Sequence, residues 1–153
     1  MENNTESNEP YDEISCGGVP VYYENDELEY LLVLHNSPYK YWAFPKGRQI
    51  QGESYEETAI REISEETGNT NFKIQKRLIS DSIYFPKRGS RTIIKKVVFF
   101  LVRFFNKQIT LSPEHISWKW VDYKTALSML TFEDYKRVLK ESNETLSKEG
   151  LIK

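Results

Sequence analysis

Short runs of apolar, β-branched and aromatic residues recur along this chain, and polar turn residues separate them. Residues 15–23 and 28–36 are two such runs, and the polar segment between them predicts a turn, so we expect a β-hairpin. Later runs of the same kind predict further strands over residues 73–82, 92–105 and 117–122.

End signals delimit a helix between residues 54 and 68. Ser54 followed by Glu57 forms a capping box, and Gly68 stands where a glycine ends a helix. At about 100° per residue, the stripe that we expect to be buried consists of Ala59, Ile60 and Ile63.

Two more helices are expected over residues 123–130 and 132–146. On the second, one stripe carries Tyr135, Val138 and Leu139. We find no internal repeat and no interdomain linker in the sequence. Strands that alternate with a few helices favour a mixed β-sheet between helices, which is an α/β/α sandwich.

Composition narrows the classes of function. The chain has 153 residues and a net charge of −2, which suits one substantial core and argues against bulk binding to DNA or to a membrane surface. No apolar run approaches the ~20 residues of a membrane span, and we expect no signal peptide. Residues 1–13 are polar and acidic and predict a disordered tail, which leaves residues 14–153 as a single domain.

The chain has one cysteine, Cys16, at the start of a predicted strand. A lone cysteine excludes an intrachain disulfide and is typical of a reducing compartment, so we expect a cytoplasmic protein. A buried thiol is the favoured interpretation over a reactive one. We expect the protein to be a monomer.

Three carboxylates project from one face of the helix predicted over residues 54–68. Glu62, Glu65 and Glu66 are three and four residues apart, and like charges at i,i+4 destabilise a helix by about 0.2–0.5 kcal/mol per pair. A choice that opposes local stability marks a functional site, and a hard divalent cation such as Mg²⁺ would compensate for it. Glu66 lies nearest the apolar stripe and should be the least exposed. Arg61 can pair at i,i+4 spacing with Glu65 and with Glu57.

A glycine-containing segment precedes this helix. Phe44-Pro45-Lys46-Gly47 leads into a loop with a second glycine, Gly52. Such a loop lets backbone N–H groups approach an anion at the helix N-terminus. Taken alone, however, a glutamate trio is more often a solvated helix face than a metal site.

The spacing from Gly47 to Asn69 changes that balance. It is a glycine, five residues, a glutamate, seven residues, Arg-Glu, two residues, Glu-Glu, one residue and a glycine, which resembles the Nudix box. Asn69 replaces the aliphatic residue usual at the last position, and this affects packing after the helix rather than the carboxylates. The resemblance also implies the Nudix fold, an α/β/α sandwich with a mixed sheet between helices.

Within that superfamily, the chain beyond the tail resembles the asymmetrical diadenosine tetraphosphate hydrolases. The similar segments are Ser15-Cys16-Gly17, Tyr41-Trp42 before the Phe44 segment, Lys95 with Val97-Val98-Phe99-Phe100-Leu101, and Leu111-Ser112-Pro113-Glu114-His115 ahead of Trp120. Arg48 and Ile50 depart from the commoner His and Glu, and the loop over residues 84–95 looks longer. Both departures bear on substrate preference.

The resemblance implies a metal site. Its ligands would be Glu62, Glu65 and Glu66 on Mg²⁺, with the Gly47 carbonyl completing the site and Mn²⁺ expected to substitute. Glu114 matches a further ligand or the general base, with an ordinary loop glutamate as the alternative. Arg61 would hold a ligand carboxylate ionised and oriented.

Polyphosphate chemistry calls for positive charge beyond the metal. A polyphosphate resists an anionic nucleophile, so catalysis needs cations that bridge its oxygens and activate water. Lys46 and Lys95 are the candidates to neutralise phosphate charge, and a solvated strand-end lysine is the alternative for each.

Nucleobase recognition is harder to locate from sequence. Tyr84 and Phe85 precede the basic pair Lys87-Arg88 and could stack a base. Aromatic residues make up 14% of the chain, so most are expected in the core. The rivals for stacking are Tyr39, Tyr41 and Tyr135. His35 and His115 share no ligand spacing with the cysteine, which favours surface or supporting roles over metal ligation.

The leading interpretation is a Mg²⁺-dependent enzyme that splits diadenosine tetraphosphate into ATP and AMP with metal-activated water. One alternative is a Nudix enzyme for another pyrophosphate: an RNA 5′ triphosphate end, a damaged nucleoside triphosphate or an inositol pyrophosphate. Bacterial RNA pyrophosphohydrolases tend to show Pro-Gln-Gly-Gly where this chain has Pro45-Lys46-Gly47-Arg48, and this difference disfavours the RNA substrate. Another alternative is a nucleotide-binding module without turnover, although such modules commonly lose box glutamates. The expected partner is a small-molecule nucleotide, with no DNA and no membrane, and with an RNA 5′ end only under the first alternative.

Overall fold

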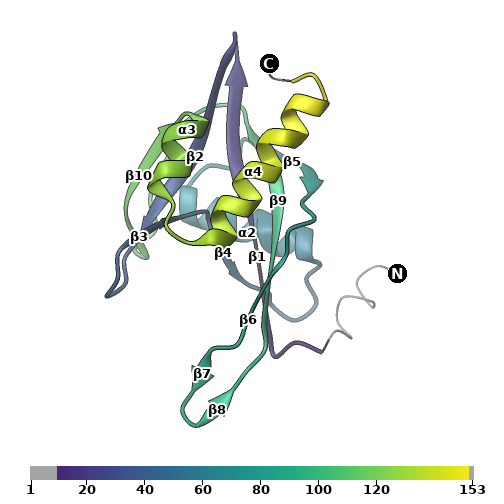
Figure 1. Cartoon of the computed structure of the whole chain (residues 1–153), viewed down its shortest axis with the longest axis vertical. Coiled ribbons are helices and arrows are strands. Elements are labelled where there is room, and N and C mark those ends of the chain that lie inside the picture. Colours follow the sequence, from purple (N-terminus) through teal and green to yellow (C-terminus); the bar gives the residue numbers. More distant parts are fainter. Residues whose placement is uncertain (1–9, 152–153) are drawn as a thin grey trace.

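A computed structural model describes residues 10–151 (Figure 1). Strands dominate the chain as far as Val121, and two helices end it. The elements in chain order are β1 (Glu13–Glu24), β2 (Glu27–His35), β3 (Tyr41–Ala43), β4 (Lys46–Arg48), α2 (Tyr55–Thr67), β5 (Phe72–Arg77), β6 (Ser82–Tyr84), β7 (Lys87–Arg88), β8 (Arg91–Thr92), β9 (Lys95–Phe104), β10 (His115–Val121), α3 (Tyr123–Met129) and α4 (Glu133–Lys148).

A mixed sheet forms the centre of the described residues. Its strand order is β10-β2-β1-β9-β5, with β3 paired to β2, β4 to β1 and β6 to β9. Only the pairing of β1 with β9 is parallel among the described strands, and the other pairs are antiparallel. In Figure 1, α3 and α4 lie over one face of this sheet and α2 lies behind the other. The expected α/β/α sandwich with a mixed sheet is confirmed.

Strand β9 explains why the chain needs helices on both sides. Its run KKVVFFLVRF is apolar at successive positions, and successive side chains of a strand point to opposite faces. Val97, Phe99 and Leu101 pack in the same core as Val138 and Leu139 of α4. The alternate residues of β9 pack on the α2 side with Ala59 and Ile63; they are Val98, Phe100, Val102 and Phe104. The central strand is therefore buried on both faces.

The predicted hairpin is confirmed as β1 and β2. Asn25 and Asp26 connect the two strands, and both have positive φ, 52° and 67°. Two-residue turns with positive φ at both positions match the twist of the flanking strands, and Asn and Asp tolerate this conformation better than most residues. The short turn fixes the pairing of Glu24 with Glu27.

Strand boundaries differ from the prediction in the middle of the chain. The strand expected over residues 73–82 ends at Arg77, and a separate β6 begins at Ser82. The loop expected around Gly47 is in part the short strand β4, which pairs with β1 at Ser15–Gly17. Residues 87–92 form the β7–β8 hairpin, which extends away from the sheet in Figure 1. Strands β4 and β6 depend on partners that are distant in sequence, and none of these short strands has a periodic signal of its own.

Helix α2 begins and ends as predicted. The Ser54 side chain accepts from the Glu57 backbone, the Glu57 carboxylate accepts from the Ser54 N–H, and Gly68 adopts the left-handed conformation at the C-cap. Ala59 and Ile63 are fully buried, but Ile60 is 41% exposed, so its predicted burial is wrong. The buried face of α2 is instead completed by Thr58 and by the other buried residues Tyr55, Glu66 and Thr67.

Most of the predicted tail, residues 1–13, lies outside the described residues. Its last two residues belong to the fold: β1 begins at Glu13, and the Asp12 N–H donates to the Ile94 carbonyl at 2.8 Å. Cys16 is buried, as expected. Within residues 10–151, no helix is long and apolar enough to cross a membrane.

Candidate active site

The three glutamates of α2 differ sharply in exposure. The side chain of Glu66 is 4% exposed, that of Glu62 is 15% and that of Glu65 is 58%. At about 100° per residue, Glu66 falls within the stripe of Ala59 and Ile63, while Glu65 falls outside it. The predicted order, with Glu66 least exposed, is confirmed.

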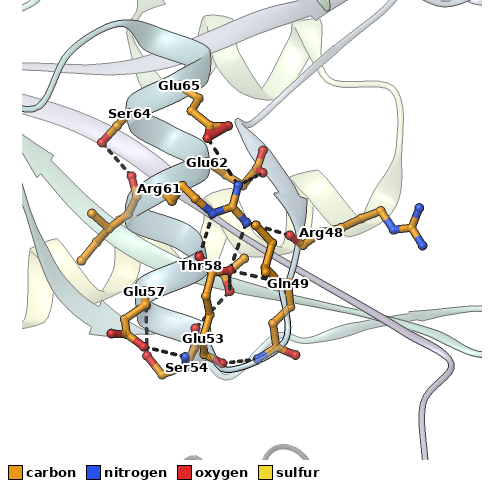
Figure 2. Close-up of polar contacts among 12 residues, drawn as sticks. Arg48, Gln49, Glu53, Ser54, Glu57, Thr58, Arg61, Glu62, Ser64 and Glu65 are labelled. Atoms are coloured by element: carbon orange, nitrogen blue, oxygen red, sulfur yellow. Dashed lines mark hydrogen bonds and ion pairs between the residues drawn. The ribbon is translucent and has the colours of Figure 1, made fainter.

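Arg61 is the centre of a polar network at the N-terminal half of α2 (Figure 2). Its Nε donates to Glu53 Oε2 at 2.7 Å and its Nη2 to Glu53 Oε1 at 3.0 Å. Its Nη1 lies 2.6 Å from Glu62 Oε2 and 3.5 Å from Glu65 Oε1. The Arg48 carbonyl accepts from Nη2 at 2.9 Å, which ties β4 to the helix.

The predicted pairing of Arg61 with Glu65 is confirmed, and that with Glu57 is wrong. The Glu57 carboxylate is held by the Ser54 N–H in the capping box, so it points toward the helix N-terminus. Glu53, in the turn before the helix, takes its place. The Arg61 hydrogen bonds lower the pKa of Glu53 to about 2, and the fixed Glu53 in turn orients the guanidinium.

Gly47 brings the strand β4 directly against α2. A Cβ atom added to Gly47 would overlap the Glu62 carboxylate, so a residue with a side chain does not fit without displacement. The pairing of Gly47 with Cys16 fixes this approach from the other side. The structure therefore places Gly47, the candidate for a carbonyl ligand, directly against Glu62, a candidate carboxylate ligand.

Glu66 is electrostatically unfavourable as an anion in this environment. Burial is the main reason that its pKa is raised, to about 9, and Glu62 adds to the shift through a hydrogen bond and through its charge. The charge of Glu114 raises it further, while a hydrogen bond from the Lys46 backbone opposes the shift. This shift favours the neutral carboxyl, and a bound cation would compensate for the charge of the ionised form.

The side chains fit a hard cation in their chemistry. Glu66 Oε2 is buried and has no hydrogen-bond partner among the described residues, and the candidate ligands supply oxygen atoms, which Mg²⁺ prefers. Within residues 10–151, no group of three or more His, Cys, Asp or Glu side chains has the geometry of a formed metal site. Glu62 and Glu65 each pair with Arg61 through one oxygen, Oε2 of Glu62 and Oε1 of Glu65, so the second oxygen of each carboxylate lies outside that pairing.

His115 contacts the buried carboxyl group of Glu66. Its Nε2 lies 3.4 Å from Glu66 Oε1, and its ring is 5.3 Å from that of His35. Burial, then the neighbouring His35 and Lys46, lower the pKa of His115 to about 4, so the imidazole is neutral. The interaction with Glu66 is thus a contact between a carboxyl and a neutral ring, which is a supporting role.

Glu114 lies in the loop before β10 and is exposed. Its charge raises the pKa of Glu66, Lys46 and His35, so it lies within electrostatic reach of all three. The Asn36 N–H donates to its carbonyl at 3.0 Å, which holds the loop against the end of β2. The fold thus brings Glu114 close to carboxylates that are about fifty residues away in sequence.

A cavity of about 640 Å³ opens beside Lys46. Its lining includes all five residues predicted to bind substrate: Lys46, Lys95, Tyr84, Phe85 and Tyr135. Burial, and then the charge of Lys95, lowers the pKa of Lys46 to about 8. Burial also lowers the pKa of Lys95. Two partly desolvated cations in one cavity favour an anionic ligand.

The aromatic residues of the cavity are unequal candidates for stacking. Tyr135 is 5% exposed and packs edge-on against Phe44 and Phe99, so most of its ring belongs to the core. Phe85 is 65% exposed. Tyr41 also lines the cavity, whereas Tyr39 is not among its lining residues.

Two residues of this site escaped the sequence analysis. The sequence gives Phe132 no role in binding substrate, yet it lines the cavity, is 49% exposed and meets the Tyr41 ring at 5.0 Å and 87°. Glu53 was a fixed position of the box with no assigned role. Its place eight residues before Arg61 is the only signal that could have indicated the pairing.

Known proteins with this arrangement identify the family. The NUDIX domain matches residues 15–141. The chain belongs to the Nudix family. Asymmetrical bis(5′-nucleosyl)-tetraphosphatase of Mus musculus is 30% identical over 125 residues, which cover 80% of this chain and 84% of that protein. An RNA pyrophosphohydrolase of Aliivibrio fischeri is 33% identical over 120 residues, covering 65% of this chain and 69% of that protein.

A solved structure agrees with this membership. The crystal structure of a C. elegans Ap4A hydrolase binary complex superimposes with a TM-score of 0.76 and 25% identity, and covers 89% of this chain and 98% of that one. The chain is therefore a Nudix hydrolase similar to the asymmetrical tetraphosphatases. Nudix hydrolases generally use divalent metal ions, and the tetraphosphatase relatives act on small nucleotide substrates.

Proposed function

We propose that this chain hydrolyses dinucleoside polyphosphates asymmetrically and converts diadenosine tetraphosphate into ATP and AMP. The observation that carries the proposal is the unpartnered, buried Glu66 Oε2, whose neighbour Lys46 lines a cavity with a second lysine and aromatic side chains. The carboxylates suit a divalent cation, the two lysines suit the phosphates, and the aromatic side chains suit a nucleobase of such a substrate. Similarity to the tetraphosphatases supports the choice of substrate.

The proposed metal ligands are Glu62, Glu65, Glu66 and Glu114 with the Gly47 carbonyl. A bound Mg²⁺, or Mn²⁺ in its place, supplies Lewis acidity toward phosphate oxygens and lowers the pKa of a bound water. Arg61 orients Glu62 and Glu65, since its own position is fixed by Glu53 and the Arg48 carbonyl.

Lys46 and Lys95 hold the phosphates in this proposal. Both ammonium groups are partly desolvated, so their attraction for a phosphate oxygen is stronger than that of exposed lysines. Phe85 and Tyr84, with Tyr41 and Phe132 as alternatives, offer aromatic surface for one nucleobase. One anchored nucleoside makes cleavage of a symmetric substrate off-centre.

Under the same proposal, the catalytic unit is a single monomeric domain that spans residues 14–153 and works in the cytoplasm. The family match over residues 15–141 supports the extent of the domain. Gel filtration with light scattering tests the monomer, and a single cooperative unfolding transition would agree with one domain.

Products of diadenosine tetraphosphate test the reaction. With Mg²⁺ in ¹⁸O-water, we expect AMP that carries the label and ATP that does not, because water attacks the phosphorus that leaves as AMP. Chromatography and mass spectrometry identify both products and the position of the label. Formation of two ADP molecules would contradict asymmetric cleavage.

An RNA 5′ triphosphate end is the second candidate substrate, because the A. fischeri relative is an RNA pyrophosphohydrolase. The same enzyme preparation is therefore given triphosphorylated RNA alongside diadenosine tetraphosphate. Efficient release of pyrophosphate from RNA, with no turnover of the dinucleotide, would select this candidate instead.

Glu114 is expected to act in the transition state. Glu114→Gln keeps the size of the side chain and removes its charge, so kcat should fall by at least about tenfold with little change in KM. Steady-state kinetics on diadenosine tetraphosphate measure both constants. Glu56→Gln, at another exposed position, is the matched control on α2 and should leave both constants unchanged. A rise in KM alone would make Glu114 a substrate-positioning residue.

A further inference from the structure

Glu13 is surrounded by positive charge at the start of β1. Arg88 Nη1 lies 2.7 Å and Arg48 Nη2 lies 3.2 Å from Glu13 Oε2, while Lys95 Nζ lies 3.7 Å from Glu13 Oε1. The Glu13 side chain is 9% exposed, and Oε1 has no hydrogen-bond partner within the described residues. One carboxylate thus faces three cations in this part of the structure, which leaves an excess of positive charge.

Four separate elements bring these groups together. Glu13 starts β1, Arg48 ends β4, Lys95 starts β9 and Arg88 lies on the β7–β8 hairpin that extends from the sheet in Figure 1. The parallel pairing of β1 with β9 aligns Glu13 with Lys95 directly. In Figure 2, the Arg48 side chain extends away from α2, although its carbonyl faces Arg61.

The cluster continues the candidate substrate cavity. Lys95 and Arg88 line the same cavity of about 640 Å³ as Lys46. The Lys46 backbone is hydrogen-bonded to Glu66, and its side chain lines the cavity with Lys95 and Arg88. Arg48 joins these cations through its ion pair with Glu13. The cavity has positive charge at a distance from the candidate metal ligands as well as beside them.

The charges in this cluster are not balanced. Burial is the main cause of the lowered pKa of Lys95, and the charges of Arg88 and Arg48 lower it further. Glu13 acts in the opposite direction and raises it. A phosphate group carries more charge than a carboxylate and offers more acceptor oxygens, and guanidinium groups bind it in a bidentate manner. A phosphate would therefore satisfy these three cations better than Glu13 does.

We propose that Arg48, Arg88 and Lys95 form a second phosphate subsite, which Glu13 occupies as an internal counter-ion in the free protein. The subsite takes a phosphate of the substrate chain that lies beyond Lys46, and it thereby favours longer polyphosphates. Glu13 competes with that phosphate and thereby determines how strongly KM depends on the number of phosphates. The role of the subsite in chain length rests on the proposed function, whereas phosphate binding by the cluster does not.

Binding of inorganic tripolyphosphate tests the subsite without turnover. Calorimetric titration in EDTA at fixed, moderate salt compares the wild type with Arg88→Gln and Glu13→Gln. We expect Arg88→Gln to weaken binding by roughly five- to tenfold, because one charge-assisted contact is lost at a half-exposed site. Glu13→Gln should tighten binding by a similar factor, since it removes the competing anion. A merely structural role for Glu13 would not produce tighter binding.

Arg91→Gln is the matched control on the same hairpin. Arg91 pairs with Asp12 at 3.0 Å, and it does not line the cavity, so its loss changes net charge equally without touching the subsite. We expect its affinity for tripolyphosphate to stay within about twofold of the wild type. Equal weakening by Arg88→Gln and Arg91→Gln, or no tightening by Glu13→Gln, would overturn the subsite. Equal melting temperatures and circular dichroism spectra establish that the variants are folded.

Kinetics with dinucleoside triphosphate, tetraphosphate and pentaphosphate test the role in chain length. For the wild type, KM should fall as the chain grows, and Arg88→Gln should remove most of that trend. If no dinucleotide is turned over but the tripolyphosphate results hold, the proposed function fails and the phosphate subsite stands. If the dinucleotides are cleaved but the chain-length trend is the same in both enzymes, the role in chain length is overturned.

Discussion

Replacing Glu66 with glutamine is expected to lower kcat by about 100-fold or more while the protein stays folded. The substitution keeps side-chain size and removes an anionic oxygen where the proposed cation binds, and loss of such a transition-state contact has effects of this size. Steady-state kinetics with Mg²⁺ and diadenosine tetraphosphate give the measurement. Turnover at the wild-type rate would show that Glu66 is not a metal ligand.

The fold should tolerate this change for a physical reason. Burial, and then Glu62, raises the pKa of Glu66 to about 9, which favours the neutral carboxyl in the metal-free protein, and glutamine resembles that form in shape and charge. Melting temperatures in EDTA should therefore be similar. Added Mg²⁺ should raise the melting temperature of the wild type and not that of Glu66→Gln, because only a bound ligand stabilises the folded state.

Glu57→Gln is the control on the same helix. It removes the same charge from an exposed position, and glutamine can still accept from the Ser54 N–H in the capping box. Both kcat and the Mg²⁺-dependent rise in melting temperature should equal those of the wild type. A comparable loss of activity in Glu57→Gln would assign the effect of Glu66→Gln to the general charge of the helix.

Local chemistry explains why much of α2 could be predicted. The capping box of Ser54 and Glu57 and the left-handed Gly68 involve only residues that are neighbours in sequence. The burial of Glu66 follows from its angular position beside Ala59 and Ile63. Ile60 shows the limit of this reasoning, because the sheet contacts a stripe that extends toward Thr58 rather than toward Ile60.

The parts that sequence could not predict depend on contacts between distant segments. Glu53 meets Arg61 because the turn before α2 folds back along the helix, and the capping box removes Glu57 from competition. Glu13 meets Arg88 across 75 residues only because β1 and β9 pair in parallel and the β7–β8 hairpin returns beside them. No periodicity or end signal encodes such a meeting. Phe132 likewise lines the cavity because of a contact between distant segments, since its ring at the start of α4 packs against Tyr41 of β3.

Gly47→Ala is expected to reduce both stability and activity. The added Cβ atom would overlap the Glu62 carboxylate, so either β4 or Glu62 must move. Overpacking of this kind lowers the free energy of unfolding by about 1–3 kcal/mol. Displacement of a proposed ligand by about an ångström should also lower kcat/KM by roughly 100-fold. Urea denaturation and steady-state kinetics measure the two effects.

A double-mutant cycle identifies the cause of that loss. Every Glu62 atom that the new Cβ would overlap is absent in Glu62→Ala, so Gly47→Ala should cost far less stability in that background than in the wild type. Activity should stay low in the double variant, because the proposed ligand is missing. Additive losses of stability would show that the overlap with Glu62 is not what excludes a side chain at position 47. If Gly47 is required so that Glu62 can lie beside β4, the effects of the two substitutions on stability should be strongly coupled. Activity should not recover in the double variant.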